Sequence, residues 1–433
     1  MQPGDGAIRA MYGGEKFGRG KYGYFNSAVD GKMQAGSTMK PFTMIAALRK
    51  GIPLYTTYSG ASPYYNRAFV YSGSDATPIQ RAGGIVNYGN SSYGPVNMRT
   101  ATQKSVNTYY AQLNLAVTPK STAASAKDAG VIGWQGDKKV PLSDGPGNVF
   151  GTDSVRVIDM ANAYATIAAE GRRATPYYIS SVTSTGAYDI DYKVKKDVRR
   201  AFPQDVARDT IQAMSLVGQP GGTAYPTVAD LGRPVGGKTG TTSNNYAAWF
   251  DGFTPGQLAT AVGMYKGDGS LTEENQLSNV GEYGEITGGT VPARIWTDYM
   301  IGALEGEPVK RLPPAGNVKY RPQTDPPTDA PAPITTKGPM AASSGTWAVG
   351  SITALGGGKY RLSNADQGTL TVTVGVRAAQ TDAGAVELPL APATDGRNLI
   401  FPLAGLRALG CTTTPNGGVL TVACGSDSVG LKP

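Results

Sequence analysis

The 433-residue sequence contains no histidine, and this absence restricts its chemistry more than any other feature of its composition. Ser-His-Asp and Cys-His catalytic arrangements are excluded, as are histidine-ligated metal sites. Two cysteines are too few for a four-cysteine zinc site or a cysteine-held iron–sulfur cluster. We therefore expect no metal and no cofactor. If the chain is an enzyme with a nucleophile, its base must be Lys, Asp, Glu, Tyr or an amine.

Long apolar segments are also lacking. No stretch approaches the roughly 20 apolar residues of a membrane-spanning helix, and the opening MQPGDGAIRAMYGG has no apolar segment of the kind found in signal peptides. The run Ala7–Tyr12 alternates in polarity and predicts a strand almost at the start of the chain. We interpret the chain as a fragment of a longer protein whose anchor or export signal lies upstream.

Basic residues outnumber acidic ones, which gives a formal net charge of +8. Such a surface suits an anionic partner such as nucleic acid, lipid headgroups or an acidic polymer. The basic residues do not form a stripe with interleaved aromatic side chains, and the run Lys193–Arg200 is interrupted by Asp197. We interpret this run as a solvated surface and expect no nucleic-acid partner.

The composition divides the chain into three parts. Residues 1–312 alternate helical and strand-like patterns, as an α/β or α+β domain does. Residues 313–340 are rich in proline and predict a stiff, extended linker. Residues 341–433 contain short β-prone runs between Gly, Asn and Asp, which predict a small all-β domain of unknown role. Among the expected elements of the first part are helices at Pro41–Lys50, Asp153–Glu170 and Asn97–Lys104, and strands at Ala247–Phe250 and Leu258–Tyr265.

Both cysteines, Cys411 and Cys424, fall in the third part, on either side of the hairpin-turn signal Pro415–Gly418. A hairpin would bring the two thiols close enough for a disulfide, and a disulfide indicates an oxidising, extracytoplasmic compartment. The alternative is a pair of buried, reduced thiols.

A serine–lysine pair offers a histidine-free nucleophile. Ser37 and Lys40 form the one Ser-x-x-Lys of the chain, and positions three apart share a face of a helix. Gly36 allows a tight turn before Ser37, and Pro41 is tolerated only in the first helical turn. Ser37 is therefore expected at a helix N-terminus, where free N–H groups stabilise negative charge. A helix cap with no catalytic role is the alternative.

The segment Lys238-Thr239-Gly240-Thr241-Thr242 combines a lysine, three hydroxyl groups and a glycine that allows close backbone approach. This combination is a plausible cradle for a carboxylate, and a solvated lysine on an edge strand is the alternative.

Ser105-Val106-Asn107 follows a helical pattern. Residues two apart point to different sides of a helix, so Ser105 and Asn107 can serve one pocket only if they lie on a loop between helices. Ser-x-Asn alone carries little information, since Ser243-Asn244-Asn245 has the same pattern.

In the order Ser-x-x-Lys, Ser-x-Asn, Lys-Thr-Gly, the three motifs match the signature set of penicillin-binding proteins and class A β-lactamases. The chain resembles the transpeptidase domain of a class A penicillin-binding protein of actinobacterial type, from about Pro3 to Leu304. The resemblance implies the α/β (α+β) penicillin-binding-protein/serine β-lactamase-like fold, an antiparallel sheet flanked by helices, followed here by the all-β domain. Further similar segments are Gly36–Thr43, Asn87–Val96, Ala161–Ala165, Gly222–Ala224 and Trp249–Pro255.

The resemblance also implies a role for each motif residue. Ser37 would be the acylated nucleophile, and Lys40, kept neutral by burial and by the charge of Lys238, would take its proton. Ser105 would pass that proton to the leaving amine, while Asn107 would hold Lys40 and the substrate amide. The backbone N–H groups of Ser37 and Thr241 would form the oxyanion hole. The residues expected to bind the terminal carboxylate of a D-Ala-D-Ala stem peptide are Lys238, Thr239, Gly240, Thr241 and Thr242.

The implied activity is that of a D,D-transpeptidase, which releases D-alanine and crosslinks peptidoglycan through a serine acyl-enzyme that β-lactams also form. A D,D-carboxypeptidase and a non-catalytic sensor of β-lactams or wall fragments remain alternatives. A β-lactamase is disfavoured, because no Glu-x-x-Leu-Asn occurs between Asn107 and Lys238, where Glu170 is the one glutamate.

Stem peptides and β-lactams are the expected partners, and the expected location is extracytoplasmic, at the cell membrane in the full-length protein. Family members of class A also carry a glycosyltransferase domain, which the sequence lacks, so we do not expect this chain to polymerise glycan.

Overall fold

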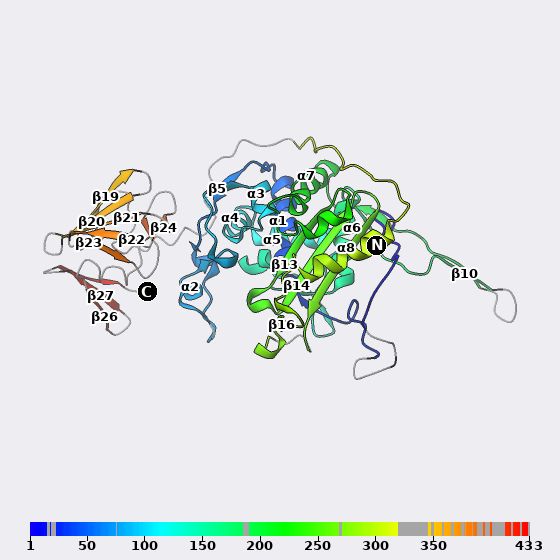
Figure 1. Cartoon of the computed structure of the whole chain (residues 1–433), viewed down its shortest axis with the longest axis horizontal. Helices are drawn as coiled ribbons and strands as arrows, with labels where there is room; N and C mark the ends of the chain where they lie inside the picture. Colours follow the sequence, from blue (N-terminus) through cyan, green and yellow to red (C-terminus); the bar gives the residue numbers. More distant parts are fainter. Residues whose placement is uncertain are drawn as a thin grey trace. The chain divides into compact units, whose positions relative to one another are not determined.

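Helices cover both faces of a three-stranded antiparallel sheet in the larger of two units that make up the computed structural model (Figure 1). This unit contains residues 1–60 and 95–327, and the other contains 61–94 and 328–433. The structure describes residues 1–318 apart from 15–17, 19–22, 75, 185–189 and 268–270, and between 345 and 431 the strands given below with positions 376 and 382.

The central sheet has the order β13-β14-β15, with bounds Gly236–Thr241, Ala247–Thr254 and Leu258–Tyr265. Its register places Lys238 opposite Asp251, and Thr254 opposite Leu258 at the tight turn between β14 and β15. The predicted strands at Ala247–Phe250 and Leu258–Tyr265 are therefore confirmed.

Seven helices of six or more residues are described in this unit. Their bounds are α1 Lys40–Arg49, α3 Met98–Gln103, α4 Asn107–Val117, α5 Pro119–Ala129, α6 Val157–Ala168, α7 Gln204–Met214 and α8 Val291–Ala303. The 3₁₀ turns are η1 Gly36–Met39, η4 Pro146–Phe150, η5 Ser215–Gly218, η6 Thr227–Leu231, η7 Ser243–Asn245 and η8 Glu273–Asn275. None of the described helices is long and apolar enough to cross a membrane.

Shorter antiparallel pairings surround the sheet. They are the sheet β1-β8-β6-β7 (Met33–Gln34, Ser154–Val155, Gly133–Gln135, Lys138–Val140), and the pairs β2 Thr57–Ser59 with β5 Pro95–Asn97, β9 Arg172–Ala174 with β12 Val198–Arg200, β10 Ser181–Ser184 with β11 Ile190–Lys193, and β16 Ser278–Val280 with β17 Tyr283–Glu285.

Four sequence predictions can be compared with these bounds. The helices expected at Pro41–Lys50 and Asn97–Lys104 are confirmed as α1 and α3. The helix expected over Asp153–Glu170 begins only at Val157, because Ser154 and Val155 pair with β1 instead. The strand expected at Ala7–Tyr12 is wrong: Ala7 makes one isolated bridge to Tyr177, and positions 9–12 are exposed, so no buried face selects a strand there.

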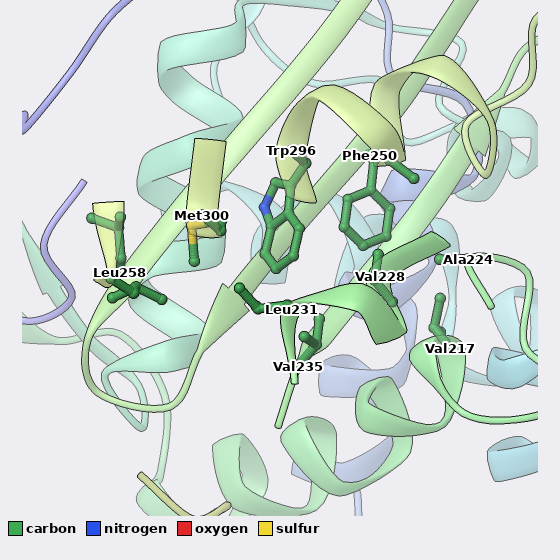
Figure 2. Packing of buried hydrophobic residues seen from close by; sticks show 11 residues of the cluster. Val217, Ala224, Val228, Leu231, Val235, Phe250, Leu258, Trp296 and Met300 are labelled. Atoms are coloured by element: carbon green, nitrogen blue, oxygen red, sulfur yellow. The ribbon is translucent and has the colours of Figure 1, made fainter. Parts of the chain in front are cut away.

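One face of the central sheet packs against α8. Phe250 of β14 meets Trp296 of α8 edge to face, with ring centroids 5.1 Å apart and an interplanar angle of 83°. Figure 2 shows both rings above the aliphatic side chains of Val228, Leu231 and Val235. Because neighbouring residues in a strand point to opposite faces, the side chain of Asp251 and that of Lys238 opposite it lie on the other face, toward η1 and α6.

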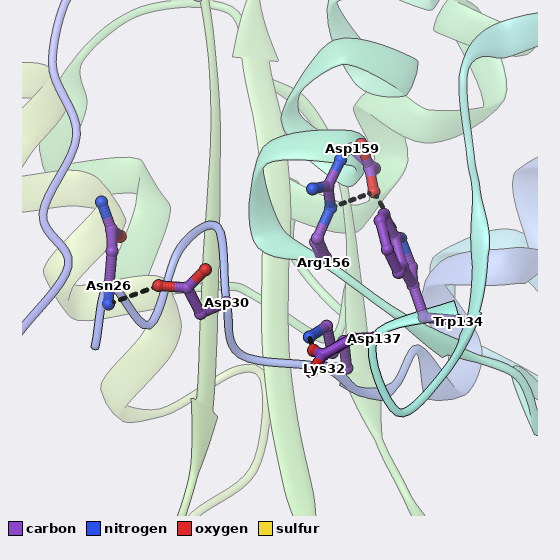
Figure 3. Close-up of polar contacts among 7 residues, drawn as sticks. All are labelled: Asn26, Asp30, Lys32, Trp134, Asp137, Arg156 and Asp159. Atoms are coloured by element: carbon purple, nitrogen blue, oxygen red, sulfur yellow. Dashed lines mark hydrogen bonds and ion pairs between the residues drawn. The ribbon is translucent and has the colours of Figure 1, made fainter. Parts of the chain in front are cut away.

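A polar cluster fixes the start of α6 beside the strand that leads into η1 (Figure 3). Arg156 donates two hydrogen bonds of 2.8 Å to Asp159, and Trp134 Nε1 donates to the same carboxylate at 3.1 Å. The guanidinium of Arg156 also lies 4.2 Å from the centre of the Trp134 ring. Lys32, directly before β1, pairs with Asp137 at 2.5 Å. Together these contacts fix the chain that enters η1.

The second unit contains short elements near residue 75 and strands after residue 345. The first group is β3 Tyr64–Tyr65, η2 Arg67–Phe69, α2 Pro78–Arg81, β4 Gly84–Ile85 and η3 Tyr88–Asn90. The six-stranded antiparallel sheet is β18 Gly345–Trp347, β19 Gly350–Gly356, β20 Lys359–Asn364, β21 Gly368–Thr373, β22 Ala378–Thr381 and β23 Gly384–Glu387. The remaining strands are β24 Ala393–Thr394, β25 Leu399–Ile400, β26 Thr412–Asn416, β27 Val419–Cys424 and β28 Asp427–Leu431.

The elements described after residue 345 are all strands, in agreement with the expected β character of 341–433. In the six-stranded sheet Leu362 lies opposite Leu370, and both side chains are buried. The two strands of the hairpin expected around Pro415–Gly418 are present as β26 and β27. Cys411 lies outside the described residues, and so does most of the expected linker 313–340. The disulfide and the three-part division of the chain therefore stay predictions.

Candidate active site

Two lysines from distant segments converge on one serine in the interior of the larger unit. Nζ of Lys40 lies 3.0 Å from Ser105 Oγ, 2.8 Å from the Ser105 carbonyl oxygen and 2.6 Å from Asn107 Oδ1. Nζ of Lys238 lies 2.8 Å from the same Ser105 hydroxyl and 2.9 Å from the Thr239 carbonyl oxygen. Both lysines are 0% exposed. The structure thus joins four of the predicted site residues: Lys40, Ser105, Asn107 and Lys238.

The electrostatic setting of these lysines disfavours two full positive charges. Burial, together with the nearby charge of Lys238, holds the pKa of Lys40 well below its usual range. Burial lowers the pKa of Lys238 to about 7. No ion pair among the described residues includes either lysine. This setting favours the neutral form of Lys40.

Ser37 lies half-buried in η1, one turn before Lys40. The backbone N–H of Lys40 donates to the Ser37 carbonyl oxygen, so Ser37 and Lys40 have the three-residue spacing of one helical turn that the sequence predicts. Pro41 occupies the first turn of α1. The expectation that Ser37 lies at a helix N-terminus is confirmed, with a 3₁₀ turn as the entry to α1.

Close backbone contact brings η1 against the end of β13. Gly36 has a φ of +58°, and a Cβ atom on it would lie 3.3 Å from the backbone nitrogen of Thr241. A Cβ on Gly240 would lie 2.8 Å from Thr38 Cγ2 and 2.9 Å from the Ala35 carbonyl oxygen. Glycine at both positions is therefore what allows the Ser37 turn to lie directly beside Thr241.

Two hydroxyl groups of β13 form hydrogen bonds with residues outside the sheet. Thr239 Oγ1 lies 2.7 Å from the Thr223 hydroxyl. Thr241 Oγ1 accepts a 3.1 Å hydrogen bond from the backbone N–H of Gly288. Thr242 differs, because its hydroxyl accepts from the N–H of Ala247 at 2.8 Å and closes the β13–β14 turn. Its expected part in substrate binding has no support in these contacts.

Ser105 owes its position to an unusual backbone conformation. It connects α3 to α4 with a φ of +55°, a region that residues other than glycine rarely adopt. Asn107 is the first residue of α4, so the predicted inter-helix loop is confirmed for Ser105, whereas Asn107 begins the next helix. The similar Ser243–Asn245 forms η7, and Asn245 bonds Glu285 at 2.7 Å rather than a site lysine.

Two contributors to the site were not predicted from the sequence. The Tyr110 ring centre lies 5.5 Å from Lys40 Nζ, and its hydroxyl is 2.7 Å from that of Thr102. Tyr110 follows Asn107 by three residues on α4. This helical spacing, which places both side chains on one face, is the sequence feature from which Tyr110 could have been predicted. Thr223 belongs to a segment already similar to the family, but nothing in the sequence shows that its hydroxyl reaches Thr239.

The chain is similar to known proteins of one family. The family described as penicillin binding protein transpeptidase domain matches residues 1–278. Penicillin-binding protein 1A of Mycobacterium tuberculosis is 31% identical over 335 residues, which are 72% of this chain and 36% of that protein. Penicillin-binding protein 1A of Mycolicibacterium smegmatis is 31% identical over 365 residues, which are 78% of this chain and 42% of that protein. The chain thus spans about two fifths of the length of these relatives.

A solved structure gives the same result for the fold. The PonA1 protein of Mycobacterium tuberculosis in complex with penicillin V has a TM-score of 0.59 and 30% sequence identity, covering 76% of this chain and 82% of that one. A second structure, described as the penicillin-binding protein PonA1 from Mycobacterium tuberculosis, has a TM-score of 0.60 and 29% identity, covering 76% of this chain and 82% of that one. The fold expected from the motifs is confirmed.

Proposed function

Since the chain belongs to the penicillin-binding protein transpeptidase domain family, we propose that it is a D,D-transpeptidase that uses Ser37 as its nucleophile. The observation that carries this proposal is that two buried lysines, Lys40 and Lys238, share the Ser105 hydroxyl. One of them, Lys40, lies one helical turn after Ser37. A serine without histidine needs a neutral amine as its base, and burial, which holds the pKa of Lys40 well below its usual range, favours that form of Lys40.

Acylation begins when the Ser37 hydroxyl attacks the carbonyl carbon of the penultimate D-alanine of a stem peptide. Lys40 takes the hydroxyl proton as the new C–O bond forms. Ser105, within hydrogen-bonding distance of both lysines, then passes a proton to the leaving nitrogen as the C–N bond breaks. Free D-alanine departs, and Ser37 carries the acyl group.

Charge on the substrate is matched by two features of the site. The terminal carboxylate lies toward Lys238 and the β13 segment with Thr239, Gly240 and Thr241, where the lysine supplies the positive charge. The oxyanion of the tetrahedral intermediate accepts hydrogen bonds from the backbone N–H groups of Ser37 and Thr241, which the close approach of Gly36 to Thr241 brings together.

The acyl-enzyme is resolved by an amine from a neighbouring stem peptide, which closes a crosslink and frees Ser37. Resolution by water would make the chain a D,D-carboxypeptidase instead, and both outcomes share the acylation site. A β-lactamase-like deacylation has less support, because Glu170 bonds Arg208 and Gln204, each at 2.6 Å, instead of facing the lysines. The assembled lysine–serine network favours an enzyme over a non-catalytic sensor.

The partners follow from this chemistry. We propose that stem peptides act as donor and acceptor, and that β-lactams, which present a strained amide beside a carboxylate, acylate Ser37. The peptidoglycan substrate lies outside the cytoplasm, so we propose an extracytoplasmic location at the cell membrane.

The test is labelling with a fluorescent penicillin, comparing the chain with Ser37→Ala and with the control Ser243→Ala, which alters the similar motif in η7. We expect a stable adduct on the peptide containing Ser37 in the original chain and in the control, and no adduct in Ser37→Ala. A folded protein without an adduct, or an adduct on another residue, contradicts the proposal.

A second assay separates the possible fates of the acyl group. The chain is incubated with a stem pentapeptide and an acceptor amine, and the products are identified by mass spectrometry. A crosslinked peptide supports transpeptidation, a shortened tetrapeptide supports the carboxypeptidase, and a stable penicillin adduct with neither product supports the sensor.

A further inference from the structure

The side chain of Asp251 is a buried carboxyl group on the face of the central sheet that the Ser37 turn covers. Asp251, in the middle of β14, is 0% exposed, and neither of its side-chain oxygens has a hydrogen-bonding partner among the residues that the structure describes. Burial of an unpaired carboxylate is costly. The roles proposed for the family motifs leave this residue unused, so its presence in the core calls for a separate explanation.

The groups that face Asp251 come from four elements. Lys238 of β13 lies directly opposite it, and Ala261 of β15 lies opposite on the other side. Burial raises the pKa of Tyr164 of α6 well above its usual range, and Asp251 lies close enough to this ring for its ionised form to add to the shift. Thr38 of η1 is close enough to favour the ionised form of Asp251, but burial dominates and raises the pKa of Asp251 well above its usual range. Burial thus favours the protonated form of Asp251, which carries one O–H donor.

Thr38 provides the matching acceptor. Its hydroxyl donates a 2.7 Å hydrogen bond to the Ala35 carbonyl oxygen, which leaves its lone pairs available. Its own carbonyl oxygen accepts a 2.9 Å hydrogen bond from the Tyr164 hydroxyl. Thr38 follows Ser37 directly and is 0% exposed, so a restraint on Thr38 also restrains the nucleophile.

We propose that Asp251 is a positioning residue of the acylation site: its carboxyl group donates a hydrogen bond to the Thr38 hydroxyl and completes a polar chain Asp251–Thr38–Ala35 that fixes Ser37 against β13. This inference rests on the proposed function, because it assigns Asp251 to the acylation step. These hydrogen bonds hold the Ser37 turn, and with it the reacting oxygen, in place. They do not involve the β13 residues that bind the substrate carboxylate. Asp251 therefore acts on the chemical step rather than on ligand binding.

The test measures the limiting rate of acylation and the half-saturating concentration of a fluorescent penicillin in four variants. Asp251→Val and Thr38→Val remove the donor and the acceptor, while Asp251→Asn keeps a donor in the same place. Thr254→Val is the matched control, since Thr254 is a second buried side chain of β14 whose hydroxyl has no partner within the described part of the chain. Thermal unfolding is recorded for each variant.

We expect Asp251→Val and Thr38→Val each to lower the limiting rate about tenfold, with the half-saturating concentration changed less than about twofold. The double variant should lose no more than the worse single variant, because both remove the same hydrogen bond. Asp251→Asn should stay within about threefold of the original rate, and Thr254→Val should not differ from it.

Several outcomes would overturn the inference. These are a normal limiting rate in folded Asp251→Val, additive losses in the double variant, or a loss confined to the half-saturating concentration. If Asp251→Val fails to fold, a normal rate in Thr38→Val, or a rate in Asp251→Asn as low as that of Thr38→Val, overturns it. Absence of any adduct in the original chain is a different result, since it refutes the proposed function itself.

Discussion

Lys40 and Lys238 approach the same oxygen from two distant segments, with their Nζ atoms 3.0 Å and 2.8 Å from the hydroxyl of Ser105. Two ammonium groups so close together repel each other strongly in a buried site. The network therefore favours a form with one proton fewer, and the additional acceptor atoms of Ser105 and Asn107 fix the position of the Lys40 amine. Arrival of a substrate carboxylate beside Lys238 would stabilise the charged form of that lysine and leave Lys40 as the base.

Ser105 combines a catalytic position with a strained backbone, and the two properties can be separated by mutation. Ser105→Ala and Ser105→Gly both remove the hydroxyl shared by the lysines, so we expect both to lower acylation at least about a hundredfold. Since φ at this position is +55°, glycine relieves strain that alanine keeps. The free energy of unfolding, measured by urea titration, should therefore be about 1 kcal/mol higher for Ser105→Gly than for Ser105→Ala.

The matched comparison for this prediction is Asn90, an exposed residue of the other unit that has a φ of +54°. Asn90→Gly should leave acylation unchanged. Equal stabilities of Ser105→Ala and Ser105→Gly would show that the backbone at Ser105 relaxes when the hydroxyl is lost.

Burial of Lys238 predicts a particular dependence of stability on pH. Its pKa is about 7 in the folded chain, against the ordinary 10.5, so between these values the unfolded chain binds more protons than the folded one. The free energy of unfolding should therefore rise with pH across this window, and the cost of burying the charge is present in full below pH 7. Lys238→Met removes this cost. We expect it to stabilise the chain by about 1–2 kcal/mol near pH 6 and by less near pH 10.

Chemical denaturation of both proteins over this pH range provides the measurement. The difference in unfolding free energy between Lys238→Met and the original chain should shrink as the pH rises. Lys310→Met is the control, because Lys310 is exposed and its amine bonds only the Gly256 carbonyl oxygen among the contacts described. A constant difference across the range would contradict a lowered pKa for Lys238.

The sequence predicted the local geometry of the site better than its surroundings. The spacing of Ser37 and Lys40, and the position of Ser105 between helices, depend on a few neighbouring residues, so helical periodicity and turn chemistry were sufficient. The start of α6 was misplaced because Ser154 and Val155 pair with β1, more than a hundred residues earlier. Such pairing depends on partners far along the chain, which local patterns cannot show.

The same limit applies to the residues around the motifs. Thr223 reaches Thr239 because a loop folds back onto β13, and Asp251 is buried because η1 covers its face of the sheet. Alternation along β14 would place Asp251 on the same face as Trp249 and Phe253, but it does not show that this face meets the nucleophile turn. Identifying these residues required the tertiary structure.

The pairing of Cys411 with Cys424 can be tested without further structural information. We expect the purified chain, expressed in an oxidising compartment, to contain one disulfide that joins these residues. Non-reducing peptide mapping by mass spectrometry should find the linked peptide, and alkylation before reduction should label neither cysteine. Since the loop closed is short, Cys411→Ser should lower stability by about 2–3 kcal/mol or less. Alkylation of both thiols in the unfolded but unreduced chain would support the buried, reduced pair instead.

The close approach of β13 to η1 gives the sharpest test of how the backbone shapes the site. A methyl group on Gly240 would lie 2.8 Å from Thr38 Cγ2 and 2.9 Å from the Ala35 carbonyl oxygen, closer than packed atoms allow. Gly240→Ala must therefore push β13 away from η1 and separate the N–H groups of Ser37 and Thr241. We expect acylation by a fluorescent penicillin to fall about a hundredfold, with a loss of about 1–3 kcal/mol in unfolding free energy.

Gly302→Ala is the matched control, because Gly302 lies exposed in α8 and a methyl group there would contact nothing within 4 Å. Alanine favours a helix over glycine, so this variant should gain up to about 1 kcal/mol of stability and acylate normally. If Gly240→Ala instead acylates at the original rate, the contact between β13 and the Ser37 turn does not set the geometry of the oxyanion hole, and the donors must be sought elsewhere. Loss of activity in Gly240→Ala alone, with Gly302→Ala unaffected, would establish that acylation requires the distance between these two backbone segments to be kept.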